Sequence, residues 1–300
     1  MEGITKEHIA DWFTGLQDTI CRSLEQLDGK AIFHEDQWMR PEGGGGRSRV
    51  IKNGNLIEKG GVNFSAVSGP TPTKILHALK LPEAEFFATG VSIVLHPENP
   101  WVPIIHMNVR YFEMSNGIWW FGGGIDLTPH FVIKEKAKNF HQHLKTTCDK
   151  HSPDFYPKFK NWADDYFFVK HREETRGVGG IFFDRLTDNE GRPKDDQWKF
   201  VQDVGETFIP AYSDAVKQLR DRDWTDADKV WQKIRRGRYV EFNLVHDKGT
   251  KFGLDTNGRT ESILMSLPPE AKWEYEHQPE TDLQKETLEL LKKGIDWVNA

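Results

Sequence analysis

Residues 86–127 read FFATGVSIVLHPENPWVPIIHMNVRYFEMSNGIWWFGGGIDL, and this stretch decides the fold. It contains three runs typical of β-strands, at about 86–96, 102–114 and 118–127, rich in β-branched and aromatic residues. The joints at 97–100 and 115–117 are so short that they can connect only antiparallel neighbours. The sequence therefore predicts an antiparallel meander.

Helices and further strands are predicted on both sides of this meander. Apolar residues at three- and four-residue spacing predict an N-terminal helix over about 5–28, and Asn53-Gly54 predicts a hairpin. Thr225 and Thr281 are predicted to begin two later helices. Strands are predicted at 181–186, 239–246 and 251–254, with Asp247 in the turn between the last two. Such blocks of helices and antiparallel strands predict an α+β fold, and we expect a single domain over residues 1–300.

Composition excludes several classes of protein. The net charge of −6 argues against a nucleic-acid-binding protein, whose surface would be basic. No run approaches the roughly 20 apolar residues of a membrane-spanning helix. Two cysteines are too few for a disulfide framework, and the first residues lack the features of a targeting peptide. We therefore expect a cytoplasmic protein with no membrane span.

Two strands of the meander place polar side chains on one face. Because side chains alternate along a strand, His106, Asn108 and Arg110 point away from the apolar residues between them. In the preceding strand, Ser92 and His96 do the same. This donor-rich set is typical of the floor of a binding site, although the alternation alone leaves an ordinary solvent-exposed face equally open.

The glycine runs do not indicate an organic cofactor. Residues 177–180 precede a predicted strand, whereas a dinucleotide site needs a strand, a tight turn and then a helix. No lysine of the phosphate-binding type follows residues 43–46. Tight turns or close backbone approach explain these glycines.

Several long motifs resemble the oxygen-dependent coproporphyrinogen III oxidase family, from about residue 43 to about residue 276. They are VSIVLHP (91–97), HMNVRY (106–111), WWFGGG (119–124), DLTP (126–129), KHR (170–172), RGVGGIFFD (176–184), RRGRYVEFNL (235–244) and ESILMSLPP (261–269). The resemblance implies a large antiparallel β-sheet flanked by α-helices on both faces. It also implies a homodimer formed through a segment at about 239–274.

The same resemblance implies an activity. Members convert coproporphyrinogen III to protoporphyrinogen IX in haem biosynthesis, with O₂ as co-substrate and no organic cofactor. The implied catalytic residues are His106 as proton donor, Asp247 under the pyrrole N–H groups, and Arg110. The implied substrate-binding residues are Ser92, Asn108, Val109, Arg110, Asn257, Gly258 and Arg259. Without the resemblance, Asp247 would be interpreted as an ordinary turn residue.

The implied substrate carries four propionates, which arginine can hold through a bidentate fork. Arg110 and Arg259 are the first candidates, and Arg47, Arg49 and Arg176 follow them. The alternative for any single arginine is a solvated surface charge. Arg110 fits that alternative least, because it shares a strand face with His106.

A divalent metal is the remaining question. The resemblance implies metal ligands at His96, His106, His141 and His171, and imidazoles do bind such metals. The four positions lack the spacing of a known metal motif, and a buried structural histidine is the alternative at His141. We therefore expect that a metal is not required.

Two other functions stay open. A histidine-ligated metal-dependent oxygenase would lose its activity on chelation. A non-catalytic tetrapyrrole carrier would need no strand face that combines histidine, asparagine and arginine.

Overall fold

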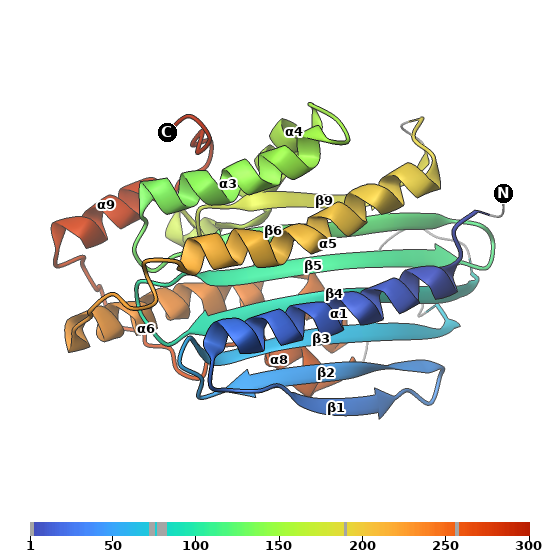
Figure 1. The fold of residues 1–300 in the computed structure, drawn as a ribbon, viewed down its shortest axis with the longest axis horizontal. Coiled ribbons are helices and arrows are strands. Elements are labelled where there is room, and N and C mark those ends of the chain that lie inside the picture. Colours follow the sequence, from blue (N-terminus) through green and yellow to red (C-terminus); the bar gives the residue numbers. More distant parts are fainter. Residues whose placement is uncertain (1–2, 72–75, 77–82, 189–190, 256–257) are drawn as a thin grey trace.

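The computed structural model describes residues 3–71, 76, 83–188, 191–255 and 258–300. Its centre is a seven-stranded sheet in which every neighbouring pair is antiparallel, in the order β1-β2-β3-β4-β5-β6-β9 (Figure 1). The strands are β1 His34–Met39, β2 Gly44–Lys52, β3 Ile57–Pro70, β4 Glu85–Pro97, β5 Ile104–Met114, β6 Trp119–Thr128 and β9 Gly180–Leu186. The predicted meander is confirmed as β4–β6.

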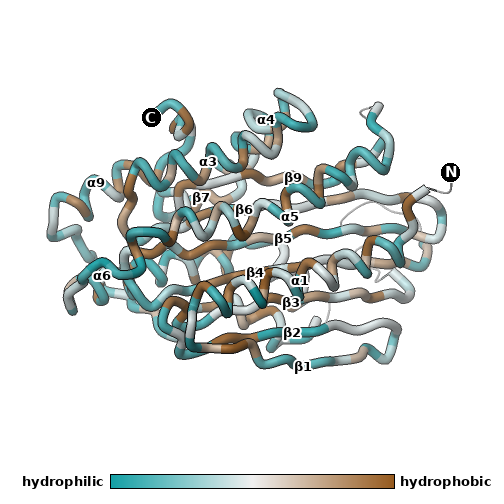
Figure 2. Tube along the Cα trace, in the orientation of Figure 1, coloured by the Kyte–Doolittle hydropathy of each residue, from teal (hydrophilic) through white to brown (hydrophobic). Residues whose placement is uncertain are grey.

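Three helices cover one face of the sheet, and the main core lies between them and the sheet, with a further contribution from Phe155 and Phe159 of α4 (Phe155–Tyr166) (Figure 1). The three helices are α1 Lys6–Asp28, α3 Lys134–Asp149 and α5 Lys194–Val216. The prediction for the first helix is confirmed, because Thr5 caps its N-terminus and Gly29 ends it at a positive φ of 78°. Alternate side chains of β4 and β5, among them Val91, Ile93, Met107 and Val109, are buried on this face, and Figure 2 shows long brown stretches along these strands.

The other face is covered by a series of helices. The series comprises α6 Asp226–Glu241, the π-helical η3 Phe242–His246, α7 Lys248–Asp255 and α8 Thr260–Leu264. The Oγ atoms of Ser262 and Ser48 lie 2.8 Å apart, which fixes α8 on β2. The expectation of an α+β fold with helices on both faces is therefore confirmed. Outside this series, α4 contacts β9, and α9 Asp282–Leu290 lies near the C-terminus.

The predicted strands at 239–246 and 251–254 are wrong. The chain there is helical, with α6 continuing to Glu241 and α7 beginning at Lys248. Tyr239 and Phe242 are buried three residues apart, so they extend the helical stripe that begins at Trp231. Their aromatic character favoured a strand, but the three- and four-residue period of the burial is that of a helix.

Two very short strands form a separate hairpin. They are β7 Phe168–Val169 and β8 Glu174–Thr175, and the 3₁₀ turn η1 Lys170–Arg172 lies between them. This hairpin follows α4 directly, and it places His171 beside the end of α6.

Candidate active site

The face of the sheet opposite the main core carries its polar side chains in rows that the strand register sets. Three successive rows contain Gly90, Arg110 and Gly122; then Ser92, Asn108 and Gly124; then Val94, His106 and Asp126. The first and third rows are four residues apart along β5, so the distance between them is about 14 Å. The predicted shared face of Ser92, His106, Asn108 and Arg110 is confirmed.

The third row contains an ion pair bound to a histidine. Asp126 Oδ1 lies 2.8 Å from Nδ1 of His106, and both carboxylate oxygens of Asp126 accept hydrogen bonds from Nη2 of Arg176 at 2.8 and 2.7 Å. Arg176 and Asp126 are only 3% and 1% exposed. Burial alone would raise the pKa of Asp126, but Arg176 and His106 lower it below the usual value.

An ionised Asp126 fixes the tautomer of His106. A carboxylate can only accept hydrogen bonds, so the proton must lie on Nδ1 of His106. Nε2 is then the nitrogen that can exchange a proton, and the half-buried ring lies on the polar face of the sheet. This geometry suits a general acid or base.

Arg176 is committed to this ion pair. Its guanidinium lies 4.3 Å from the ring centre of Phe167 and 4.6 Å from that of Phe242, and it also donates to Asn243. It therefore cannot receive a substrate carboxylate unless Asp126 is displaced. This observation removes Arg176 from the arginines considered for that role.

Arg110 is available to a ligand. Its Nη1 donates to Asn108 at 2.7 Å and its Nη2 donates to Asp184 at 2.8 Å, and the Arg110 and Asp184 side chains are 36% and 34% exposed. An arginine has five N–H groups, so two hydrogen bonds leave others free.

Ser92 and Val109 differ in their orientation. Ser92 is half-buried and is paired with Asn108 in the register, so it borders the polar face. Val109 is fully buried on the core face, so only its backbone can border a ligand on the polar side.

Asp247 is the N-terminal cap of α7 and does not lie in a hairpin turn. Its Oδ2 accepts 2.7 Å hydrogen bonds from the backbone N–H and the hydroxyl of Thr250, and its Oδ1 accepts one from Tyr166 at 2.8 Å. Burial would raise the pKa of Asp247, but the hydrogen bonds from Thr250 and Tyr166 lower it. The half-buried group is therefore a carboxylate that can accept one further N–H through Oδ1.

The remaining predicted arginines lie toward the β1 edge of the sheet. Arg259 precedes α8, forms an ion pair with Asp36 of β1 and donates to Ser262 at 3.2 Å. Arg47 and Arg49 point to the α1 side, where both form ion pairs with Asp18 and Glu35. They are therefore on the face opposite His106. Gly258 donates its N–H to Gly253, and Asn257 lies outside the described residues.

The four predicted metal ligands have four different sets of partners. His141 uses both ring nitrogens, with the Tyr156 hydroxyl and the Val178 carbonyl each at 2.9 Å. His96 is fully buried and contacts the carbonyl of Ser266. His171 contacts Glu241 and His246. The four histidines therefore do not fit one metal site, and no group of three potential ligands occurs among the described residues.

Three residues to which sequence reasoning gave no role lie at this site: Asp126, Asp184 and Tyr166. The position of Asp126 could have been predicted from the sequence. In a hairpin whose turn is centred on Asn116, paired residues lie equally far from Asn116 along the chain. His106 and Asp126 are each ten residues from Asn116, so they lie opposite each other. Asp184 and Tyr166 come from distant segments, and no local signal indicates their positions.

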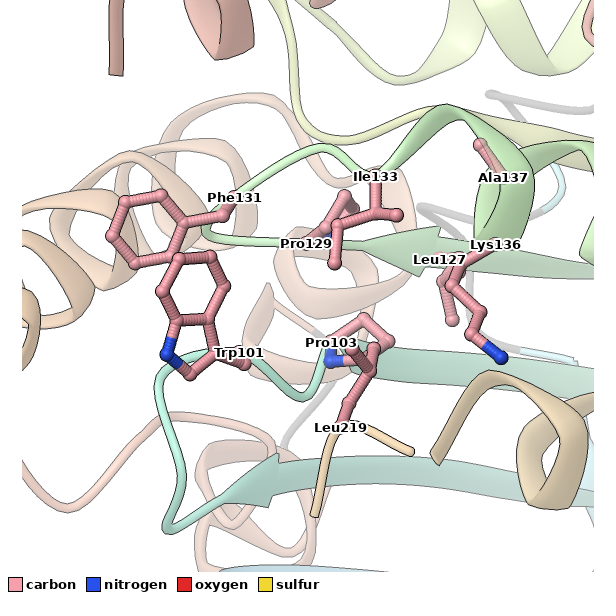
Figure 3. Close-up of a pocket in the computed structure, with 9 residues that line it drawn as sticks. All are labelled: Trp101, Pro103, Leu127, Pro129, Phe131, Ile133, Lys136, Ala137 and Leu219. Carbon is pink, nitrogen blue, oxygen red and sulfur yellow. The ribbon is translucent and has the colours of Figure 1, made fainter. Parts of the chain in front are cut away.

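An apolar crevice lies elsewhere in the molecule. Figure 3 shows its lining, which comes from the loop at Trp101, the end of β6 and the start of α3. Leu127 and Ala137 in this lining belong to the main core, so the crevice is on the side of the sheet opposite His106. Its only charged lining residue is Lys136. It is therefore no part of the candidate active site.

Comparison with known proteins tests the resemblance directly. A family model described as coproporphyrinogen III oxidase matches residues 8–297. The chain belongs to the coproporphyrinogen III oxidase family. The mitochondrial oxygen-dependent coproporphyrinogen-III oxidase of Rattus norvegicus is 49% identical over 298 residues, which cover 94% of this chain and 67% of the relative.

Two further relatives of this oxidase family member come from distant organisms. The chloroplastic coproporphyrinogen-III oxidase 1 of Arabidopsis thaliana is 49% identical, and the match covers 94% of this chain and 76% of the relative. The oxygen-dependent coproporphyrinogen-III oxidase of Prochlorococcus marinus (strain MIT 9312) is 45% identical, and the match covers 98% of this chain and 93% of the relative. Among the described residues, no helix is both long and apolar enough to cross a membrane.

Proposed function

We propose that this family member catalyses the oxygen-dependent oxidative decarboxylation of coproporphyrinogen III to protoporphyrinogen IX in haem biosynthesis. The observation that carries the proposal is the polar sheet face, on which an accessible arginine and an acid–base histidine lie about 14 Å apart along one strand. The names of the relatives support the same substrate and oxidant.

The balance of the reaction determines what the site must supply. Each propionate loses CO₂ and a hydrogen to become a vinyl group, while O₂ takes up two electrons and becomes H₂O₂. The carboxylate, O₂ and one proton therefore give the vinyl group, CO₂ and H₂O₂. Two such steps complete the conversion. The electron-rich porphyrinogen supplies the electrons, so the protein must hold carboxylates and deliver protons.

Arg110 and Arg259 are the proposed partners of carboxylates on opposite sides of the substrate. Asp36, the partner of Arg259, lies in the register row of Asn108, four strands away. Four strand spacings separate β1 from β5 by about 19 Å. The two guanidinium groups can lie closer together than this, because both arginine side chains are long. This span suits a macrocycle with propionates at its edge, and both arginines are about one-third exposed.

His106 is the proposed proton donor. Asp126 holds its Nδ1, so Nε2 can carry the proton that each decarboxylation consumes. Asp126 itself stays ionised beside Arg176 and acts by orienting the ring. Ser92 and Asn108 border the space between His106 and Arg110.

Asp247 is the proposed acceptor for the pyrrole N–H groups. Its lowered pKa keeps it anionic, and an anion near the ring centre stabilises positive charge that develops as electrons pass to O₂. The proposal requires the substrate to lie between the sheet and η3–α7.

We also propose a homodimer formed through residues at about 239–274. Leu244, Val245 and Leu254 in this segment are 41–48% exposed, and Trp273 is 53% exposed. Exposed apolar groups of this kind are typical of subunit interfaces. Sedimentation analysis tests this proposal, and a monomer at micromolar concentration would contradict it. The cytoplasmic location stays a prediction, because two relatives are named mitochondrial or chloroplastic.

The deciding experiment incubates purified protein with coproporphyrinogen III with and without O₂. We expect protoporphyrinogen IX, CO₂ and H₂O₂ only in the aerobic sample. Binding without turnover would favour a carrier. Turnover that is lost on chelation and restored by iron would favour a metal-dependent oxygenase.

A further inference from the structure

We propose that Asp184 determines how tightly the site binds a propionate, because it occupies Arg110 when no ligand is present. In this arrangement the Asp184 carboxylate takes the place of the substrate carboxylate on the guanidinium. The inference rests on the proposed function, in which Arg110 binds a propionate. It assigns to Asp184 a role in binding affinity rather than in chemistry.

Asp184 lies on the polar face, because it follows the core residue Phe183 in β9, and a β-bulge begins at this point. Phe183 and Leu186 of β9 are buried in the main core and pair with Gly123 and Phe121 of β6. Two residues, Asp184 and Arg185, therefore oppose the single residue between Phe121 and Gly123, and Arg185 has a positive φ of 52°. Bulges of this kind often lie beside active sites, where they redirect a side chain.

The residue that opposes the bulge is Gly122, and it makes room for the ion pair. A Cβ atom at Gly122 would lie 2.6 Å from Oδ1 of Asp184 and 2.8 Å from Nη2 of Arg110. The two charged groups therefore lie against the backbone of β6, where another residue would place a side chain. The bulge and this glycine together indicate a built arrangement rather than a chance surface ion pair.

The exposure of the pair makes exchange possible. Both side chains are about one-third exposed, so Asp184 can move into water when a propionate arrives, without burying an unpaired charge. When the carboxylate has left as CO₂ and the vinyl group remains, Asp184 can return to Arg110. An unopposed Arg110 would bind every polyanionic ligand more tightly, including intermediates that have to turn or leave.

Asp184→Asn tests this inference, because it keeps the shape and removes the competing charge. The measurement is the Kd of coproporphyrin III, the oxidised form of the substrate, from the quenching of tryptophan fluorescence. The charges of Asp184 and Arg110 are about 5 Å apart, and a propionate must displace Asp184 to bind. At an effective dielectric constant of about 50, the attraction between the two charges corresponds to about a tenfold change in a binding constant. We therefore expect the Kd to fall about tenfold, and the KM for coproporphyrinogen III to fall with it.

Asp18→Asn is the matched control. Asp18 also pairs with arginines and is 38% exposed, but it lies on the opposite face of the sheet. This variant should leave the Kd unchanged. If the Kd falls equally in both variants, the change in net charge alone explains the effect, and the inference is overturned. An unchanged or higher Kd in Asp184→Asn alone would also overturn it.

A double-mutant cycle separates this inference from the proposed function. In an Arg110→Ala background, Asp184→Asn should no longer tighten binding, because its partner is gone. Tightening that persists there would overturn the inference even if single variants behave as expected. If Arg110→Ala alone leaves the Kd unchanged, the carboxylate site itself, and thus the proposed role of Arg110, is wrong. Thermal midpoints of all variants check that each is folded.

Discussion

The change Asp126→Asn tests the buried ion pair that positions His106. The carboxylate accepts two hydrogen bonds from Arg176, and an amide in its place would turn an N–H₂ donor toward other donors. Breaking one partner of a buried pair typically costs about 3–5 kcal/mol. The rings of Phe167 and Phe242 would still stabilise the Arg176 cation in the variant. We therefore expect the free energy of unfolding to fall by about 3 kcal/mol, the lower end of this range.

The assay is urea unfolding followed by tryptophan fluorescence, with kcat/KM measured on the same samples. His106 would lose the anion that fixes its tautomer, so kcat/KM should fall by about 100-fold or more. The pKa of Asp126 is lowered, so the pair stabilises the wild type fully above the usual aspartate pKa. This stabilisation is lost as the pH falls through the lowered pKa, and the variant should lack that dependence.

Asp203→Asn is the control for this prediction. Asp203 accepts hydrogen bonds from His151 at 2.7 Å and Lys199 at 2.9 Å, so it repeats the histidine–aspartate–cation arrangement in another part of the chain. Because Lys199 is exposed, this change should cost less stability and leave kcat/KM unaltered. The double change of Asp126→Leu and Arg176→Met should recover stability without activity. An Asp126→Asn protein with wild-type stability and activity would refute the reasoning.

Three further predictions concern the proposed reaction. Asp247→Asn should lower kcat by about 100-fold with little change in thermal midpoint, because asparagine caps a helix as well as aspartate but carries no charge; activity within a few-fold of wild type would leave Asp247 as a cap only. Arg110→Lys should lower kcat/KM by about tenfold or more, since lysine lacks the planar fork; a near-normal value would remove Arg110 from the site. Extensive chelation should leave at least half of the activity, since the four histidines share no ligand geometry; near-complete loss, reversed by one divalent metal, would disprove this.

Much of the sheet face could be predicted from sequence because its information is local. Alternation along one strand placed His106 and Arg110 together, and short joints determined which strands are neighbours. The pairing of His106 with Asp126 was also within reach, because the hairpin turn sets the register of β5 and β6. These relations depend on residues close in the chain, so no knowledge of the tertiary fold is needed.

The partners from outside the meander could not be predicted in this way. Arg176 directly follows β8 and reaches Asp126 from 50 residues away in the chain, and Asp184 reaches Arg110 only because β9 pairs with β6. The aromatic and β-branched residues around Asp247 favour strands, whereas packing against neighbouring elements keeps this segment helical. Burial against another element overrode the local preference there.

The position of Asp247 at the start of a helix changes what the site can do. In a hairpin, the carboxylate would lie at an exposed loop tip, where water would weaken any interaction with a ligand. As the cap of α7, it is held by Thr250 of α7 and Tyr166 of α4, with one lone pair of Oδ1 unused. The helical assignment therefore strengthens the proposed role, because a fixed, partly buried anion stabilises developing charge more than a mobile, hydrated one does.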